Sequence, residues 1–247
     1  MMIHRPIIRS QYALGRPFTG DQKATEPWEK QALRGRIIMG FRRISDDQVE
    51  QLDRLQSEYF SKYMHLFDPP LPDGVLERLE RIVASAHIGR TDVVLDMGAG
   101  TGILIPVIRK YNPTLIYAND LSRKMLNSVK ERYPEVKILH GDIRDLELPD
   151  KCLDVILVNA CYPNIVDKHR SFATMGRMTE TGGRVVVSHP MGREFIDFLQ
   201  KKVPFPLDDF PDSAAVAEEL FAPYGFRVSN FVDEDKLYIL TLERVEA

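Results

Sequence analysis

One short stretch, residues 93–103, constrains the fold of this 247-residue chain more than any other. It opens with the apolar run 93–95 and continues into Asp96. Three glycines follow at alternate positions: Gly98, Gly100 and Gly102. The apolar run predicts a buried strand, and apolar residues at helical spacing predict a helix over 103–110. Because a strand that passes through a glycine loop into a helix brings backbone N–H groups to one point, the stretch predicts a cofactor-binding corner.

The spacing of the glycines separates two kinds of cofactor. The dinucleotide fingerprint is G-x-G-x-x-G, and its loop wraps a pyrophosphate. Here an acid precedes the glycines, in the order Asp96-x-Gly98-x-Gly100-x-Gly102. A carboxylate beneath the loop repels a pyrophosphate and attracts a positively charged ligand. The pattern resembles the first motif of the class I S-adenosylmethionine-dependent methyltransferases, a strand followed by (D/E)-x-G-x-G-x-G, and this resemblance implies S-adenosyl-L-methionine as the cofactor.

Strand and helix signals alternate from residue 91 onward, as in a doubly wound parallel sheet. The expected strands are 93–96, 114–120, 136–139, 153–158 and 184–188, followed by a hairpin of 226–232 and 237–242. A dinucleotide-binding sheet would continue with parallel strands, whereas the methyltransferase sheet ends in an antiparallel pair with its last strand beside the fifth. We therefore expect an α/β fold with a seven-stranded, mostly parallel, Rossmann-like sheet. The resemblance is closest to the small-molecule branch that includes quinone-biosynthesis C-methyltransferases, although no substrate-specifying motif supports that branch.

The sequence divides into an extension and one domain. Residues 1–44 show no sustained periodicity, and the first 43 hold seven arginines and two lysines against three acids. We expect an irregular basic extension there; an organelle-import signal is the alternative. Residues 45–247 are the expected methyltransferase domain, with N-terminal helices over 45–88 and an α/β core over 91–244. The helices carry an aromatic cluster that forms either a lid over the site or ordinary packing: Tyr59, Phe60, Tyr63 and Phe67.

Composition excludes several classes of function. The chain has 44% hydrophobic residues and a net charge of −3, which gives no reason to expect nucleic acid as a partner. No apolar run approaches the roughly 20 residues that a membrane-spanning helix needs. The two cysteines and six histidines match no disulfide framework and no metal motif. We expect a soluble, cytoplasmic protein whose partner is a small-molecule methyl acceptor; the sequence does not indicate its oligomeric state.

Polar residues stand at the expected carboxyl ends of five strands: Asp96, Asp120, Asp142, Asn159 and His189. In open parallel sheets, ligands bind past these ends. Asp120 is the strongest candidate, because the two oxygens of a carboxylate can accept hydrogen bonds from both ribose hydroxyls. Its alternative role is to cap the helix that follows. The neighbouring Leu121 is then expected to lie against an adenine face.

Further roles follow from the family resemblance. The loop Asp96, Gly98, Ala99, Gly100, Thr101 and Gly102 is expected to hold the methionine part of the cofactor. Asp142 resembles the acid that accepts from the exocyclic amine of adenine, while the N–H of Ile143 faces a ring nitrogen; the alternative for Asp142 is a solvated turn acid. The backbone carbonyl of Asn159 is expected to meet the cofactor's ammonium group.

Methyl transfer is an in-line displacement, so the protein mainly aligns the acceptor and excludes water. A general base is needed only if the acceptor enters protonated, and His189 and Tyr162 are the candidates, with a structural role as the alternative for each. Residues 159–162 share an asparagine and an aromatic residue with the (D/N)-P-P-(Y/F) motif of amino-directed enzymes but lack both prolines, so transfer to an amide or adenine nitrogen is not expected. Two alternatives remain: an NAD(P)-dependent oxidoreductase and a non-catalytic, methyltransferase-like binding subunit.

Overall fold

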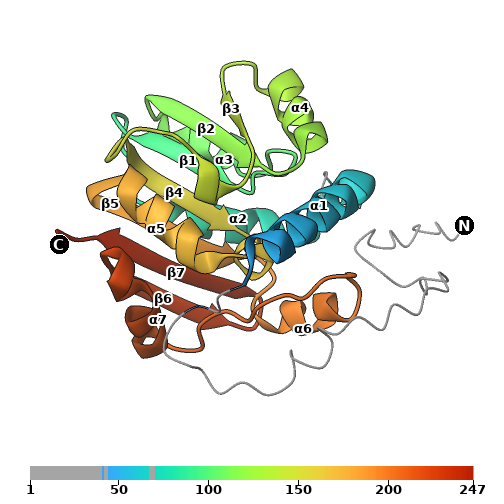
Figure 1. The fold of residues 1–247 in the computed structure, drawn as a ribbon. Coiled ribbons are helices and arrows are strands. Elements are labelled where there is room, and N and C mark those ends of the chain that lie inside the picture. The colour runs from blue at the N-terminus through green and yellow to red at the C-terminus, as the bar shows by residue number, and fades with distance from the viewer. Residues whose placement is uncertain (1–40, 42–43, 67–69, 247) are drawn as a thin grey trace, which may run out of the picture.

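The computed structural model describes residue 41 and residues 44–66 and 70–246. Within them, seven strands form one sheet in the order β3-β2-β1-β4-β5-β7-β6 (Figure 1). The strands are β1 Val93–Met97, β2 Leu115–Asp120, β3 Lys137–His140, β4 Leu153–Asn159, β5 Thr179–His189, β6 Phe226–Glu234 and β7 Leu237–Arg244. The first five are parallel, and β7 pairs antiparallel with both β5 and β6. The predicted sheet, with its last strand beside the fifth, is confirmed.

Helices cover both faces of this sheet (Figure 1). They are α1 Asp46–Tyr63, α2 Val75–Ala84, α3 Ile105–Ile108, α4 Arg123–Arg132, α5 Lys168–Met178, α6 Glu194–Gln200 and α7 Ala214–Phe221, with short 3₁₀ turns η2 Met64–Leu66, η3 Arg109–Tyr111, η4 Ile143–Asp145, η5 Tyr162–Asn164 and η6 Ala222–Tyr224. Because neighbouring residues of a strand point to opposite faces, Val94 joins a core with α2, α3 and α4, whereas Leu95 joins one with α5 and α7. Both cores are apolar, so the strands are buried on both sides.

Local sequence explains where several elements begin. Ser45 caps α1 in a capping box with Gln48. The helix predicted over 103–110 is shorter in the structure. A turn closed by the hydrogen bond from Ile105 N–H to Gly102 O precedes it, α3 then has four residues, and a 3₁₀ turn follows directly. Strand β5 begins at Thr179, earlier than the predicted 184, because Gly182 takes a positive φ of 81° and lets the strand continue irregularly.

Some predictions lie outside the described residues. Nearly all of the expected basic extension, including residues 1–40, belongs to this part of the chain, and so does Phe67 of the aromatic cluster. Among the residues that the structure describes, no helix combines the length and the apolar character needed to cross a membrane.

Candidate functional site

A cavity of about 280 Å³ opens at the carboxyl ends of the parallel strands. Eleven of the predicted site residues line it: Asp96, Gly98, Ala99, Gly100, Thr101, Asp120, Leu121, Asp142, Ile143, Asn159 and His189. This placement follows from the parallel sheet, because the carboxyl ends of its strands share one edge. Gly102 and Tyr162 were predicted with this group and are not among the lining residues.

The glycine loop after β1 owes its shape to different constraints at each glycine. Gly98 has a φ of +68°, and a Cβ built there would overlap the Sγ of Cys161. Gly100 has a φ of +55°, and a Cβ there would meet nothing within 4 Å. A side chain at Gly100 would therefore occupy open space in the cavity. A Cβ at Gly102 would meet Ile105 and Val129, so this glycine serves the packing of the loop on α3 and α4.

Asp120 ties the glycine loop to the start of α4. Its Oδ2 accepts a hydrogen bond of 2.8 Å from the backbone N–H of Gly100, and its Oδ1 accepts one of 2.8 Å from Ser122 N–H. Burial raises the pKa of this carboxyl group, and the two backbone N–H groups oppose that rise. The cap of α4 is Ser122, whose Oγ accepts from Met125 N–H, so Asp120 is not the capping residue. Each carboxylate oxygen keeps acceptor capacity for a ligand.

Asp96 is a buried acid at the start of the glycine loop, and one of its carboxylate oxygens has no hydrogen-bond donor among the described residues. The residue is 2% exposed, and that oxygen is Oδ2. Burial, with a further contribution from the nearby Asp120 carboxylate, raises the pKa of Asp96 to about 7. A buried carboxylate without a partner is costly, and a cation in the cavity would remove that cost. The site therefore fits a positively charged ligand.

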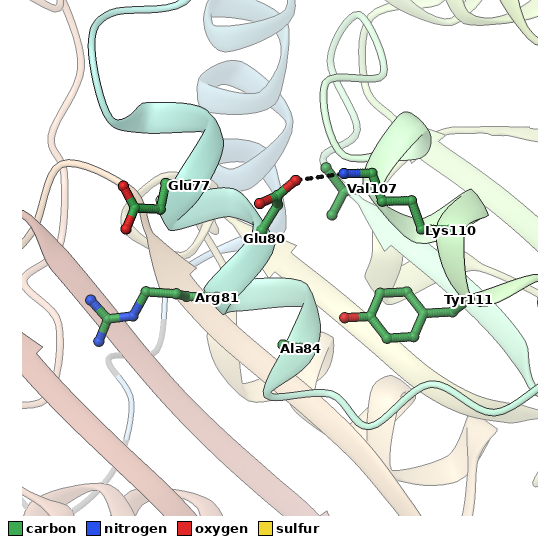
Figure 2. Close-up of a pocket in the computed structure, with 7 residues that line it drawn as sticks. All are labelled: Glu77, Glu80, Arg81, Ala84, Val107, Lys110 and Tyr111. Carbon is green, nitrogen blue, oxygen red and sulfur yellow. Dashed lines mark hydrogen bonds and ion pairs between the residues drawn. The ribbon is translucent and has the colours of Figure 1, made fainter.

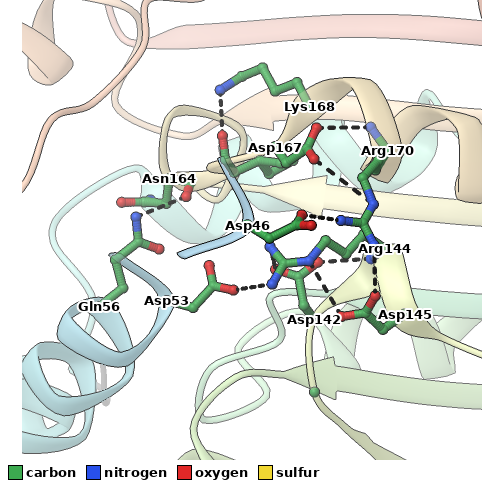
Figure 3. A network of polar contacts seen from close by, with 12 residues as sticks. Asp46, Asp53, Gln56, Asp142, Arg144, Asp145, Asn164, Asp167, Lys168 and Arg170 are labelled. Atoms are coloured by element: carbon green, nitrogen blue, oxygen red, sulfur yellow. Dashed lines mark hydrogen bonds and ion pairs between the residues drawn. The ribbon is translucent and has the colours of Figure 1, made fainter. Parts of the chain in front are cut away.

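Asp142 belongs to a charged network that joins α1 to the loop after β3 (Figure 3). Its Oδ1 accepts from Arg144 N–H at 2.8 Å, and its Oδ2 lies 3.4 Å from the Arg144 guanidinium. The same guanidinium forms a 2.6 Å ion pair with Asp53 of α1. Burial raises the pKa of Asp53 to about 6. The Asp142 side chain is 14% exposed and caps η4, and the buried Ile143 lies beside it, so Asp142 is not a freely solvated turn acid.

Asn159 and His189 end the next two strands. The hydroxyl of Ser188 donates to Asn159 Oδ1 at 3.1 Å and fixes the asparagine side chain. The backbone N–H of Met191 donates to His189 Nδ1 at 3.1 Å, so the neutral ring carries its proton on Nε2. Burial lowers the pKa of His189 to about 4. At neutral pH the imidazole is uncharged and too weakly basic for an efficient general base.

Tyr162 is placed away from the cavity. It lies in η5, is 2% exposed and stacks on Phe210 with ring centroids 5.3 Å apart. Phe172 and Phe221 pack against the same ring. Burial raises the pKa of Tyr162 well above its usual value. The structure thus gives Tyr162 a position in the core, although it follows Asn159 by only three residues.

The helix α1, on which the sequence places most of the aromatic cluster, forms a wall of the cavity. Its contribution consists of Gln56, Ser57, Tyr59, Phe60 and Tyr63. The Gln56 side chain donates to Asn164 O at 2.9 Å, and the Ser57 hydroxyl donates to Leu121 O at 3.2 Å. Tyr59 also packs edge-on against Phe205 at 5.4 Å. Tyr59, Phe60 and Tyr63 of the predicted aromatic cluster therefore line the cavity and also pack against one another and against Phe205.

A second hollow between α2 and α3 is not a candidate site (Figure 2). Its two basic residues already have acidic partners: Lys110 pairs with Glu80, and Arg81 pairs with Glu234 at 2.7 Å. No predicted site residue lies there. Among the described residues, no group of three or more His, Cys, Asp or Glu side chains is arranged to hold a metal ion.

Comparisons with known proteins agree with this geometry. Residues 95–187 match the model of the methyltransferase domain family. An uncharacterized methyltransferase of Schizosaccharomyces pombe is 27% identical over 189 residues, which cover 72% of this chain and 73% of the yeast protein. A demethylmenaquinone methyltransferase of Paenarthrobacter aurescens is 32% identical over 124 residues, which cover 48% of each protein. The chain thus spans about half the length of this second relative.

A solved structure extends the likeness to the whole fold. A SAM-dependent methyltransferase from Aquifex aeolicus has a TM-score of 0.60 at 18% identity, covering 75% of this chain and 98% of that one. An identity this low shows a shared fold alone. The domain match over residues 95–187 and the strand order β3-β2-β1-β4-β5-β7-β6 make this chain similar to the class I methyltransferases.

Proposed function

We propose that this protein transfers a methyl group from S-adenosyl-L-methionine to a small-molecule acceptor. The observation that carries the proposal is Asp96, a buried carboxylate without a partner, beside the open space at Gly100. S-adenosylmethionine carries an ammonium and a sulfonium group, and the sulfonium activates its methyl carbon for displacement. A diphosphate would instead place negative charge beside the carboxylates of Asp96 and Asp120, which disfavours a nicotinamide cofactor.

Each part of the site has a role in this proposal. Asp120 accepts hydrogen bonds from the ribose hydroxyls, and Leu121 lies against the adenine. Asp142 and the Ile143 N–H read the adenine edge. The loop from Gly98 to Thr101 lets the methionine part approach the bare backbone, and Asp96 balances its positive charge. Asn159 offers its carbonyl to the ammonium group. Names of relatives such as demethylmenaquinone methyltransferase support a small-molecule acceptor.

The protein's contribution to the reaction is alignment and exclusion of water. Residues of α1 and α6 line the cavity, so a bound acceptor would displace water from the space beside the methyl group. His189 is uncharged in this setting, and Tyr162 lies in the core, so the proposal assigns neither of them the role of general base.

Isothermal titration calorimetry of the full chain with S-adenosylhomocysteine tests the proposal. We expect micromolar binding, and no detectable binding of NADH in a parallel fluorescence titration. NADH binding without S-adenosylhomocysteine binding would establish the oxidoreductase alternative and refute the proposal. Binding without methyl transfer to any acceptor would instead support the non-catalytic binding subunit.

A further inference from the structure

The charges on the cavity wall are confined to one side. Acidic side chains come from the ends of β1, β2 and β3, which are adjacent in the sheet: Asp96, Asp120 and Asp142. His189 ends β5, on the other side of β1, and is uncharged at neutral pH. Among the described residues that line the cavity there is no lysine, arginine or glutamate. The cavity is therefore acidic toward β3 and uncharged toward β5.

The uncharged side has an apolar surface, which we call the acceptor wall. It consists of Phe60, Met191, Phe195, Leu199, Val203 and Leu207. Phe195 also packs against the His189 ring, with centroids 5.4 Å apart. An anionic acceptor on this wall would lose its hydration without gaining a cationic side chain of the protein, and it would face three carboxyl groups across the cavity. The wall therefore disfavours carboxylates and phosphates.

His189 supplies a hydrogen-bond donor beside this apolar surface. His189 Nδ1 accepts from Met191 N–H at 3.1 Å, so its second nitrogen carries the proton. Among the described residues no group pairs with that Nε2–H, and because His189 lines the cavity the N–H can donate to an oxygen of a bound molecule. Because the ring cannot easily take up a proton, it favours an oxygen that accepts a hydrogen bond over one that must lose a proton to the protein.

On the basis of the proposed function, we propose that the methyl acceptor is an uncharged, largely apolar molecule with an oxygen that accepts a hydrogen bond from His189 Nε2–H. His189 is then a specificity-determining residue and not a general base. The acceptor wall determines which molecules enter, and the imidazole orients them toward the methyl group.

Matched probes test the charge preference on protein saturated with S-adenosylhomocysteine. The ring pair is 2-acetylnaphthalene and 2-naphthoate, the chain pair is 2-undecanone and decanoate, and 2-isopropylnaphthalene is the probe without oxygen. In each pair that binds, calorimetry should show the ketone at least tenfold tighter than the carboxylate, and 2-acetylnaphthalene severalfold tighter than the hydrocarbon. A carboxylate that binds as tightly as its ketone, or no binding by any probe, overturns this inference. Failure of S-adenosylhomocysteine to bind overturns the proposed function instead, and it is seen before any probe is added.

Two substitutions test the role of the imidazole. His189→Gln keeps an N–H donor near the position of Nε2, whereas His189→Leu removes it. We expect 2-acetylnaphthalene to bind about tenfold more weakly to His189→Leu and nearly normally to His189→Gln, without a change in binding between pH 6 and 8. Equal losses in the two variants would overturn the donor role. If His189→Leu does not fold, a loss of ketone binding in folded His189→Gln would also overturn the donor role.

Discussion

The two sides of the cavity are built by different means. We call the acidic side with Asp96, Asp120 and Asp142 the cofactor side, and the side with the acceptor wall the acceptor side, after the ligands proposed for them. On the cofactor side, Asp96 and Asp120 end adjacent strands, and backbone N–H groups hold Asp120 in place. On the acceptor side, the lining comes from helices α1 and α6 and the segment after α6, held by contacts such as Tyr59 against Phe205. Strand pairing thus fixes the cofactor side, whereas side-chain packing fixes the acceptor side. Substitutions on one side should leave the ligand of the other side largely unaffected.

The largest effect is expected from Asp120→Asn. Both carboxylate oxygens accept from backbone N–H groups, so either orientation of an amide places its NH₂ against a donor from Gly100 or Ser122. The variant also loses part of the ribose contact. We expect S-adenosylhomocysteine to bind about 100-fold more weakly by calorimetry, which corresponds to about 2.7 kcal/mol.

Asp154→Asn is the matched control for this substitution. Asp154 Oδ2 also accepts from a backbone N–H, that of Val93 at 2.7 Å, but at the amino end of the strands. Its loss should lower stability and leave S-adenosylhomocysteine affinity within about threefold, because Asp154 lies at the opposite ends of the strands from the cavity. Equal losses of affinity in both variants would mean that sheet distortion, and not the Asp120 carboxylate, controls binding.

The contrast also explains how much the sequence could predict. Parallel strands share an edge, so locating the strands also located Asp96, Asp120, Asp142, Asn159 and His189. No such rule places α1, because its contacts join residues far apart in the chain, as in the hydrogen bond from Gln56 to Asn164 O.

Tyr162 shows the same limit within one loop. Its position after Asn159 predicted a place in the cavity, but the turn η5 directs the ring onto Phe210. The direction of a side chain after a strand depends on local turn geometry, and the order of residues does not reveal it. Strand order was therefore predictable, and the packing that shapes the acceptor side was not.

Asp96→Asn should change stability and affinity in opposite directions. The folded pKa of Asp96 is about 7, above that of an unfolded aspartate, so the native state binds the proton more tightly. The free energy of unfolding therefore falls as pH rises from about 4 to about 7, and the cost persists at pH 8. An asparagine removes the buried charge, so we expect thermal melts of the ligand-free variant at pH 8 to show a gain of about 1–2 kcal/mol.

Binding by the same variant provides the second measurement. The charged form of Asp96 attracts the ligand's ammonium, so the affinity of the wild type for S-adenosylhomocysteine should rise between pH 6 and 8. In Asp96→Asn the affinity should be about tenfold lower at pH 8 and nearly independent of pH over that range. An unchanged melting temperature together with unchanged binding would show that Asp96 is neutral in the folded protein and takes no part in the cofactor side.

Leu199→Lys tests the acceptor side by adding the missing cation. Leu199 lies on α6 and lines the cavity, so a lysine there brings an ammonium group near the acceptor wall. We expect 2-naphthoate affinity to rise about fivefold, with S-adenosylhomocysteine affinity within about twofold, as measured by calorimetry. Phe198→Lys is the control, because Phe198 is on the same helix, is 37% exposed and does not line the cavity. A similar gain in both variants would reflect net charge and not the wall.

The smallest effect is expected where the two sides are joined, at the ion pair of Asp53 with Arg144 (Figure 3). Burial raises the pKa of Asp53 to about 6, so this group lowers the free energy of unfolding as pH rises from about 4 to about 6. The melting temperature of the wild type should therefore fall between pH 5 and 7, and Asp53→Asn should make this fall smaller. The difference should correspond to about 1 kcal/mol or less in the free energy of unfolding, because solvent and Arg144 offset part of the Asp53 charge.

The same variant also measures how far α1 belongs to the cofactor side. Arg144 keeps Asp142 and Asp145 as neighbours, so we expect only about a twofold loss of S-adenosylhomocysteine affinity. Glu50→Gln, an exposed acid on the same helix, is the control for the change of charge and should alter neither measurement. A loss as large as that of Asp120→Asn would show that the position of α1 governs the adenine end of the cavity. Side-chain packing by α1, and not strand pairing alone, would then determine the cofactor side near Asp142.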